Sequence, residues 1–167
     1  MSLNKPLQHG VGMVEVLVAL LVMSIGVLGY AGLQLRALGS AEEAYVRSQA
    51  MAIAQDAVER IAANGTGRNT YEDTDSWPAD LQTTRPGNWL QCINADCDGG
   101  QIADWDIAQL AWMASDLLPA GRIDAAACSG SSAVCVRVAW NGDAPTDCED
   151  EDGVVSDRNC IVLEVVR

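Results

Sequence analysis

The sequence predicts an α+β fold in which a long N-terminal helix packs on a small antiparallel β-sheet, with a second helix and disulfide-stapled loops. Three observations lead to this prediction. No proline interrupts residues 7–77, which begin with two consecutive helical patterns. Two segments near the C-terminus alternate apolar and polar residues, as half-buried strands do. All six cysteines lie beyond the first helical pattern.

The first pattern, residues 11–33, is apolar throughout except for one acid, Glu15. A helix of about 20 such residues can cross a bilayer. A secretory signal peptide would have a shorter apolar stretch of about 7–15 residues. A soluble core helix would not be apolar all round, and an ordinary anchor leaves Glu15 unexplained, because a carboxylate there costs about 2.5–3.5 kcal/mol on insertion scales.

The second pattern, residues 34–64, is amphipathic, and one long helix from Val11 to about Ala63 is expected. Its apolar face carries Val46, Ala50, Ile53, Ala54, Ala57 and Ile61. The opposite face carries Glu42, Glu43, Arg47, Asp56, Glu59 and Arg60, with Asp56 and Arg60 spaced for an ion pair. Asn64-Gly65 predicts the end of the helix.

The remaining residues, 65–167, are expected to form a globular domain. Residues 65–101 are interpreted as a loop with little regular structure, in which Trp77 and Trp89 anchor the core. A second helix is expected from Ile102, capped by Asp104 or Asp106 and ended by Pro119-Ala120-Gly121. Its expected buried face comprises Ile107, Leu110, Ala111, Ala114, Leu117 and Leu118.

Two strands are expected, at residues 133–140 and 160–167, separated by an acidic loop over 141–159. The first alternates Val134, Val136, Val138 and Trp140 on one side; the second alternates Ile161, Leu163 and Val165. Because two strands alone are marginal, the sheet requires a third strand or the long helix as support.

Charge and composition exclude several functions. The net charge is −13, and the only lysine and histidine are Lys5 and His9. If the first ten residues are removed, no histidine base, Schiff-base lysine or histidine metal ligand remains. An acidic chain with scattered arginines also argues against nucleic acid as a partner. No cofactor, metal site or catalytic residue is therefore expected.

The six cysteines are interpreted as disulfides formed in an oxidising compartment. Six cysteines allow 15 pairings, and the sequential one is favoured because each bond closes a short loop. The favoured pairs are Cys92–Cys97, Cys128–Cys135 and Cys148–Cys160. Zinc is the alternative, but the closely spaced cysteine pairs of structural zinc sites are absent.

Calcium is a second alternative for two acidic segments. Asn94, Asp96, Asp98 and Gly99 match the start of an EF-hand loop, but Trp105 stands where its last acidic ligand belongs. The segment CEDEDGVVSD fails at its first and last ligand positions. Solvated acidic loops are the favoured interpretation of both.

The segment HGVGMVEVLVALLV resembles the signature of type IV prepilins, a polar leader ending in Gly followed by a hydrophobic helix with Glu as its fifth residue. The resemblance implies a leader over residues 1–10, cleavage by a prepilin peptidase between Gly10 and Val11, and methylation of the new amine. The family usually has Phe or Met where this chain has Val11, a departure that concerns methylation rather than cleavage.

The resemblance also explains Glu15. Its carboxylate can pair with the N-terminal amine of a neighbouring subunit, which offsets the cost of burying the charge and sets the register between helices. Gly26, Gly29, Gly32 and Gly39 leave two interpretations open, close helix packing or a segment that unwinds during assembly.

The segments AYVRSQAMAIAQDAVERIAANG and DIAQLAWMASDLLPAG are similar to the PilV family of minor pilins. That resemblance implies a type IV pilin fold and a role in the tip and priming complex of a pilus. Its partners would be other minor pilins, a tip adhesin and the prepilin peptidase. A single span in the inner membrane would leave the C-terminal domain in the periplasm, because the positive charge precedes the span; assembly would then carry it to the cell surface.

Three other functions are weighed against this one. A minor pseudopilin of a type II secretion system shares the EVLVALLV segment. A DNA-capturing competence pilin conflicts with the acidic composition. A membrane-tethered enzyme would need a histidine, lysine or metal site that the processed chain lacks.

Overall fold

The computed structural model describes residues 12–87, 92, 96–129, 133–150 and 153–165. The chain divides into two compact units, residues 1–43 and 44–167, and each is described by itself. Helix α1, Met13–Ala63, begins in the first unit and ends in the second. In the first unit every described residue of α1 is exposed, as an all-round apolar helix without an intramolecular partner must be.

In the second unit, the last turns of α1 supply one wall of the core. Their buried residues are Ala50, Ile53, Ala54, Ala57 and Ile61, which confirms the predicted apolar face. The helix ends at Ala63, immediately before the predicted stop. There the Asn64 side chain accepts a hydrogen bond from the backbone N–H of Gly67 at 3.2 Å and so caps the next element.

The segment after α1 is more regular than expected. It contains the 3₁₀ turn η1 (Gly65–Gly67), helix α2 (Arg68–Glu72) and the turn η2 (Thr74–Ser76), so the prediction of a loop over 65–101 is wrong for residues 65–76. The described residues between Trp77 and Asp98 contain no helix or strand, as predicted. Two glycines let residues 65–76 pack closely on the helix that follows: a Cβ on Gly67 would lie 2.2 Å from the Gly99 carbonyl oxygen. These elements are too short for hydrophobic periodicity to reveal them.

Helix α3, Gly99–Leu117, starts three residues earlier than predicted and is capped by Asp98, not by Asp104 or Asp106. The Asp98 carboxylate accepts from the Gln101 backbone N–H at 2.9 Å, and the Gln101 side chain accepts from the Asp98 N–H at 3.0 Å. This is a reciprocal capping box. The predicted apolar face is buried except for Leu117, which is 47% exposed.

The sheet has three antiparallel strands in the order β1-β2-β5: β1 is Arg122–Ala127, β2 is Val134–Ala139 and β5 is Cys160–Val165. The two predicted strands are β2 and β5, and β1 is the third strand that the prediction required. Between β2 and β5 the chain forms the turn η3 (Pro145–Cys148) and a short hairpin of β3 (Glu149–Asp150) and β4 (Gly153–Val154).

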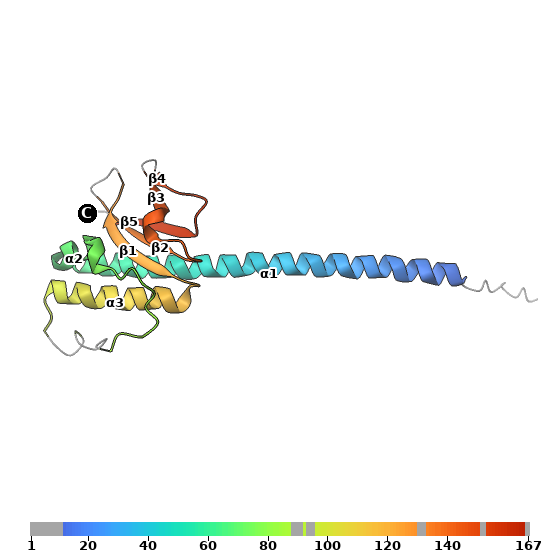
Figure 1. Cartoon of the computed structure of the whole chain (residues 1–167), viewed down its shortest axis with the longest axis horizontal. Coiled ribbons are helices and arrows are strands. Elements are labelled where there is room, and N and C mark those ends of the chain that lie inside the picture. Colours follow the sequence, from blue (N-terminus) through green and yellow to red (C-terminus); the bar gives the residue numbers. More distant parts are fainter. Residues whose placement is uncertain (1–11, 88–91, 93–95, 130–132, 151–152, 166–167) are drawn as a thin grey trace, which may run out of the picture. The chain divides into compact units, whose positions relative to one another are not determined.

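The core lies between the sheet and the two long helices of this unit, α3 and the end of α1 (Figure 1). The register aligns Val136 of β2 with Ala125 of β1 and with Leu163 of β5 on the inner face. Strand β2 is buried on both faces, not half-buried as predicted, because Cys148 and Cys160 cover Ala139 on the outer face. Trp77 is buried in the core, whereas Trp89 lies outside the described residues.

This arrangement is the predicted α+β fold, a long N-terminal helix whose end packs with a small antiparallel sheet, a second helix and disulfide-bonded loops.

Candidate assembly site

The apolar half of α1 is the largest exposed hydrophobic surface of the described chain. Its large apolar side chains from Met13 to Leu38 are 48% to 87% exposed. Its most apolar 18-residue window has a mean hydropathy of 2.4, long and apolar enough to cross a membrane. The Ser24 hydroxyl donates to the Leu20 carbonyl at 2.7 Å, so this polar group is satisfied within the helix. Such a surface requires a lipid or protein environment.

Glu15 lies in the first turn of this helix. The backbone N–H groups of Glu15 and Val16 both point to the Gly12 carbonyl, at 3.0 and 3.3 Å, so the helix begins immediately before the acid. A carboxylate in a first turn interacts favourably with the helix dipole, which is one stabilising role for Glu15.

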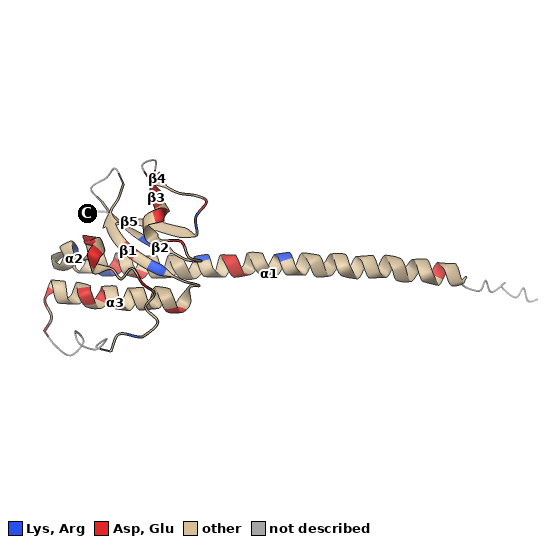
Figure 2. Cartoon of the chain, in the orientation of Figure 1, with Lys and Arg blue, Asp and Glu red and all other residues tan. Residues whose placement is uncertain are grey.

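In the described part of its unit, no positively charged residue lies near Glu15. The next cation along the helix is Arg36, about six turns later and roughly 30 Å away along the axis. Figure 2 shows the intervening helix without charge. Gly10 and Val11, the predicted cleavage site, lie outside the described residues. The amine that cleavage would create is four residues from Glu15 in the sequence.

The six cysteines form three disulfides, Cys92–Cys97, Cys128–Cys135 and Cys148–Cys160, the same pairs that the sequence favours. No cysteine is free. The sulfur atoms of Cys128 and Cys135 and a carboxylate oxygen of Glu149 lie within 4.8 Å of one another. Because both sulfurs are in a disulfide, they provide no thiolates for zinc.

Of the residues considered for calcium, Asp98 and Glu149 have other partners, and Asn94 lies outside the described residues. Asp98 is occupied as the α3 cap. Glu149 is buried beside Arg137, with 3.7 Å between its Oε2 and the Arg137 Nη1. Asp143, which lies outside the two segments considered for calcium, accepts from the Asn159 backbone N–H and side-chain amide at 2.8 and 2.9 Å. These bonds lower the pKa of Asp143, with a further contribution from Arg158.

A polar network joins the end of α1 to α3. The Arg60 guanidinium donates to both oxygens of Asp56, as their spacing predicted, and to Asp106 at 2.9 Å. The Tyr71 hydroxyl donates to the other oxygen of Asp106, and burial together with this bond raises the tyrosine pKa. Burial opposes the charge on Arg60, but the bonds to Asp56 and Asp106 raise its pKa. These groups hold the helices together and leave no acid or base poised for chemistry.

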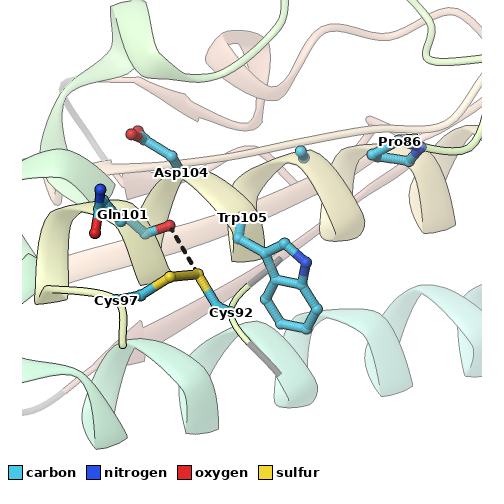
Figure 3. Close-up of a pocket in the computed structure, with 7 residues that line it drawn as sticks. Pro86, Cys92, Cys97, Gln101, Asp104 and Trp105 are labelled. Carbon is cyan, nitrogen blue, oxygen red and sulfur yellow. Dashed lines mark hydrogen bonds between the residues drawn. A yellow bond between two sulfur atoms is a disulfide. The ribbon is translucent and has the colours of Figure 1, made fainter. Parts of the chain in front are cut away.

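One shallow pocket of about 230 Å³ lies at the start of α3 (Figure 3). It is lined by Pro86, Cys92, Cys97, Gln101, Asp104, Trp105 and Ala108. The Cys92 sulfur lies 3.8 Å from the Gln101 carbonyl oxygen, a contact rather than a donated hydrogen bond because the sulfur is in a disulfide. The pocket holds one carboxylate and no nucleophile, so its described lining does not resemble an active site.

Sequence reasoning missed three polar features of the second unit. It did not find the Asp98 cap, the pairing of Asp124 with Arg137, or the position of Arg122 beside a pocket. The D-x-x-Q spacing at residues 98–101 was a readable capping signal. The other two depend on strand β1, which the sequence did not reveal.

Comparison with known families agrees with this picture. Residues 5–31, which include Gly10, Val11 and Glu15, match the prokaryotic N-terminal methylation motif. Residues 32–108 match the Tt1218-like family, described as type IV pilin Tt1218. No curated protein and no solved structure gives a significant match. Pilins are structural proteins rather than enzymes. The chain therefore has an N-terminal segment that matches the methylation motif, followed by an α+β fold of the type IV pilin kind, and over these residues it is similar to type IV pilins.

Proposed function

We propose that this chain is a PilV-like minor pilin that enters the tip and priming complex of a type IV pilus. In that role it supports pilus assembly, display of a tip adhesin, attachment and twitching motility. The observation that carries the proposal is Glu15, a single acid at the head of an exposed apolar helix, within the methylation motif. Its charge becomes favourable once an amine of a neighbouring subunit pairs with it.

The proposed organisation follows from this role. Residues 1–10 are a leader removed by the prepilin peptidase between Gly10 and Val11. Residues 11–33 anchor the subunit in the inner membrane and then enter the filament core. Residues 34–64 continue the helix into the globular domain, residues 65–167, which lies in the periplasm before assembly and on the pilus afterwards.

The disulfides support a periplasmic location, because such bonds persist in oxidising compartments. The acidic charge supports protein partners, namely other minor pilins and a tip adhesin, over nucleic acid. The chain needs no cofactor or metal for this role.

A deletion strain of the source bacterium tests the proposal. Loss of the gene should reduce surface pili and twitching, and the tagged full chain should restore both and copurify with other minor pilins. A strain with normal pili and normal twitching would contradict the proposal.

The second candidate is a minor pseudopilin of a type II secretion system, which the apolar segment EVLVALLV fits equally well. The same deletion strain separates the two. A pseudopilin deletion would leave pili intact and retain folded exoproteins in the periplasm.

A further inference from the structure

A second pocket, of about 190 Å³, lies in the second unit where strand β1 meets two loops. Five apolar residues line it, Trp77, Pro78, Ala79, Ala144 and Pro145, with the threonines Thr74 and Thr146. Arg122, Ile123 and Asp124 of β1 complete the lining. Pockets for drug-sized ligands measure about 300–1,000 Å³. This one accommodates about a single side chain.

Arg122 is the unusual member of this lining. Its Nε atom is buried without a hydrogen-bond partner, and the guanidinium forms no ion pair with any residue in the described part of the chain. The buried arginine of the next strand, Arg137, is by contrast fully engaged with acids. A guanidinium has five N–H donors in a planar fork that matches a carboxylate.

The other charged group of the pocket does not neutralise Arg122. Both carboxylate oxygens of Asp124 accept from Arg137, at 2.7 and 2.8 Å. Strand register explains why Asp124 pairs with Arg137 and not with Arg122: Asp124 lies opposite Arg137, whereas Arg122 lies opposite Ala139. The pocket therefore presents one unpaired positive charge on a chain of net charge −13.

We propose that this pocket binds the carboxylate of a glutamate or aspartate side chain on a partner subunit. The Arg122 fork would receive the carboxylate, and the walls of Trp77 and the two prolines would cover the methylene groups behind it. Arg122 and Trp77 both line the pocket, and arginine and tryptophan are among the residue types that dominate binding at protein interfaces. That the partner is a neighbouring subunit rests on the proposed pilus function.

The net charge of the chain favours a protein-bound acid over a free anion. The acidic surface repels small anions in solution. A carboxylate carried by a protein gains further contacts around the rim of the pocket, which a free ion lacks.

The test uses the isotope-labelled full chain in detergent micelles and three probes. These are the capped peptides acetyl-Gly-Glu-Gly-amide and acetyl-Gly-Gln-Gly-amide, and acetate. The Glu peptide should produce saturable shifts of the Arg122 Nε–H and of the Thr74 and Thr146 amides. The Gln peptide should bind about tenfold or more weakly, because the charge-assisted bonds are lost.

Variants assign the effect to the guanidinium. Arg122→Gln should abolish the response, Arg122→Lys should weaken it because the fork is lost, and the exposed Arg36→Gln should leave it unchanged. Unchanged amide shifts outside the pocket verify that each variant is folded. Equal binding of the two peptides, or full binding by Arg122→Gln, would overturn the proposal. If acetate bound as tightly as the Glu peptide, the inference that the carboxylate belongs to a partner subunit would be refuted.

An experiment in cells tests the proposed partner of the pocket separately from the proposed pilus function. Arg122→Gln should lower copurification of other minor pilins while leaving leader removal and membrane level normal; undiminished copurification would contradict the partner assignment. If the deletion strain retains its pili, the pilus function fails, but the peptide titration still decides whether the pocket takes a carboxylate.

Discussion

Arg137 of β2 and Asp124 of β1 face each other across the outer side of the sheet and form a two-point ion pair, with Nε and Nη2 of the arginine donating at 2.7 and 2.8 Å. Both side chains are about nine-tenths buried. Burial raises the pKa of Asp124; Arg137 acts against that shift, and the nearby Glu149 adds to it. One guanidinium thus serves two buried carboxylates.

Breaking this pair should be strongly destabilising. Arg137→Met leaves Asp124 and Glu149 buried without a counterion, and we expect a loss of about 3–5 kcal/mol in the free energy of unfolding. The double variant Arg137→Met with Asp124→Leu should lose less than the sum of the two single variants. Denaturant unfolding of the full chain in micelles measures both. The control is Arg158→Met at an exposed pair, expected to cost less than about 1 kcal/mol.

The Asp143 carboxylate makes stability depend on acid pH. Its pKa is lowered in the folded chain by Asn159 and Arg158, so the folded state binds fewer protons than the unfolded state near pH 3–4. The stabilisation is present above about pH 4 and is lost as the pH falls through the lowered pKa. Thermal unfolding from pH 2 to 6 should show Asp143→Asn less stable than the natural chain only at the upper end. A constant difference across this range would exclude the linkage.

The disulfides should differ in their contribution to stability. Cys148–Cys160 closes the longest of the three loops, with a sequence separation of 12, and Cys148 is fully buried. Its removal as a double alanine variant should cost about 2–4 kcal/mol, more than removal of Cys92–Cys97 with its separation of 5. Chemical unfolding compares the two variants. Alkylation of the natural chain without reductant should label none of the six cysteines; labelling of a folded cysteine would contradict the assigned pairs.

Leader removal should depend on Gly10. Substitution of this residue should block the prepilin peptidase and leave a precursor about ten residues heavier in the inner membrane. Mass spectrometry of the natural chain should find Val11 at the N-terminus. Any other first residue would refute the cleavage site.

Glu15 should matter for assembly rather than for insertion. Glu15→Leu removes a charge that costs a few kcal/mol in the bilayer, so membrane level and cleavage should stay normal. Incorporation into the tip complex should fall, because the amine of a neighbouring subunit is left unpaired in an apolar seam. Pulldown of partner minor pilins and a count of surface pili measure the effect. Met13→Leu is the matched control for a change in the same helical turn, and full recovery of both readouts in Glu15→Leu would exclude the pairing.

The sequence by itself determined those helices and strands that depend on the pattern of neighbouring residues. The apolar run at 11–33, the buried stripe of α1 and its end before Asn64-Gly65 follow from helical periodicity and stop residues. Strands β2 and β5 follow from their alternating β-branched residues. The importance of Glu15 could be predicted because the free-energy cost of placing its charge in a membrane helix depends only on the apolar residues around it.

Tertiary structure decided the features that depend on distant partners. Strand β1, with the sequence RIDAAA, has weak strand propensity and exists because β2 pairs with it and the core covers Ile123. That pairing brings Asp124 to Arg137 and leaves Arg122 facing a pocket whose one described acid, Asp124, is already paired. A shift of the register by one residue would turn these side chains to the other face, and register is set by packing across the sheet rather than by any local pattern.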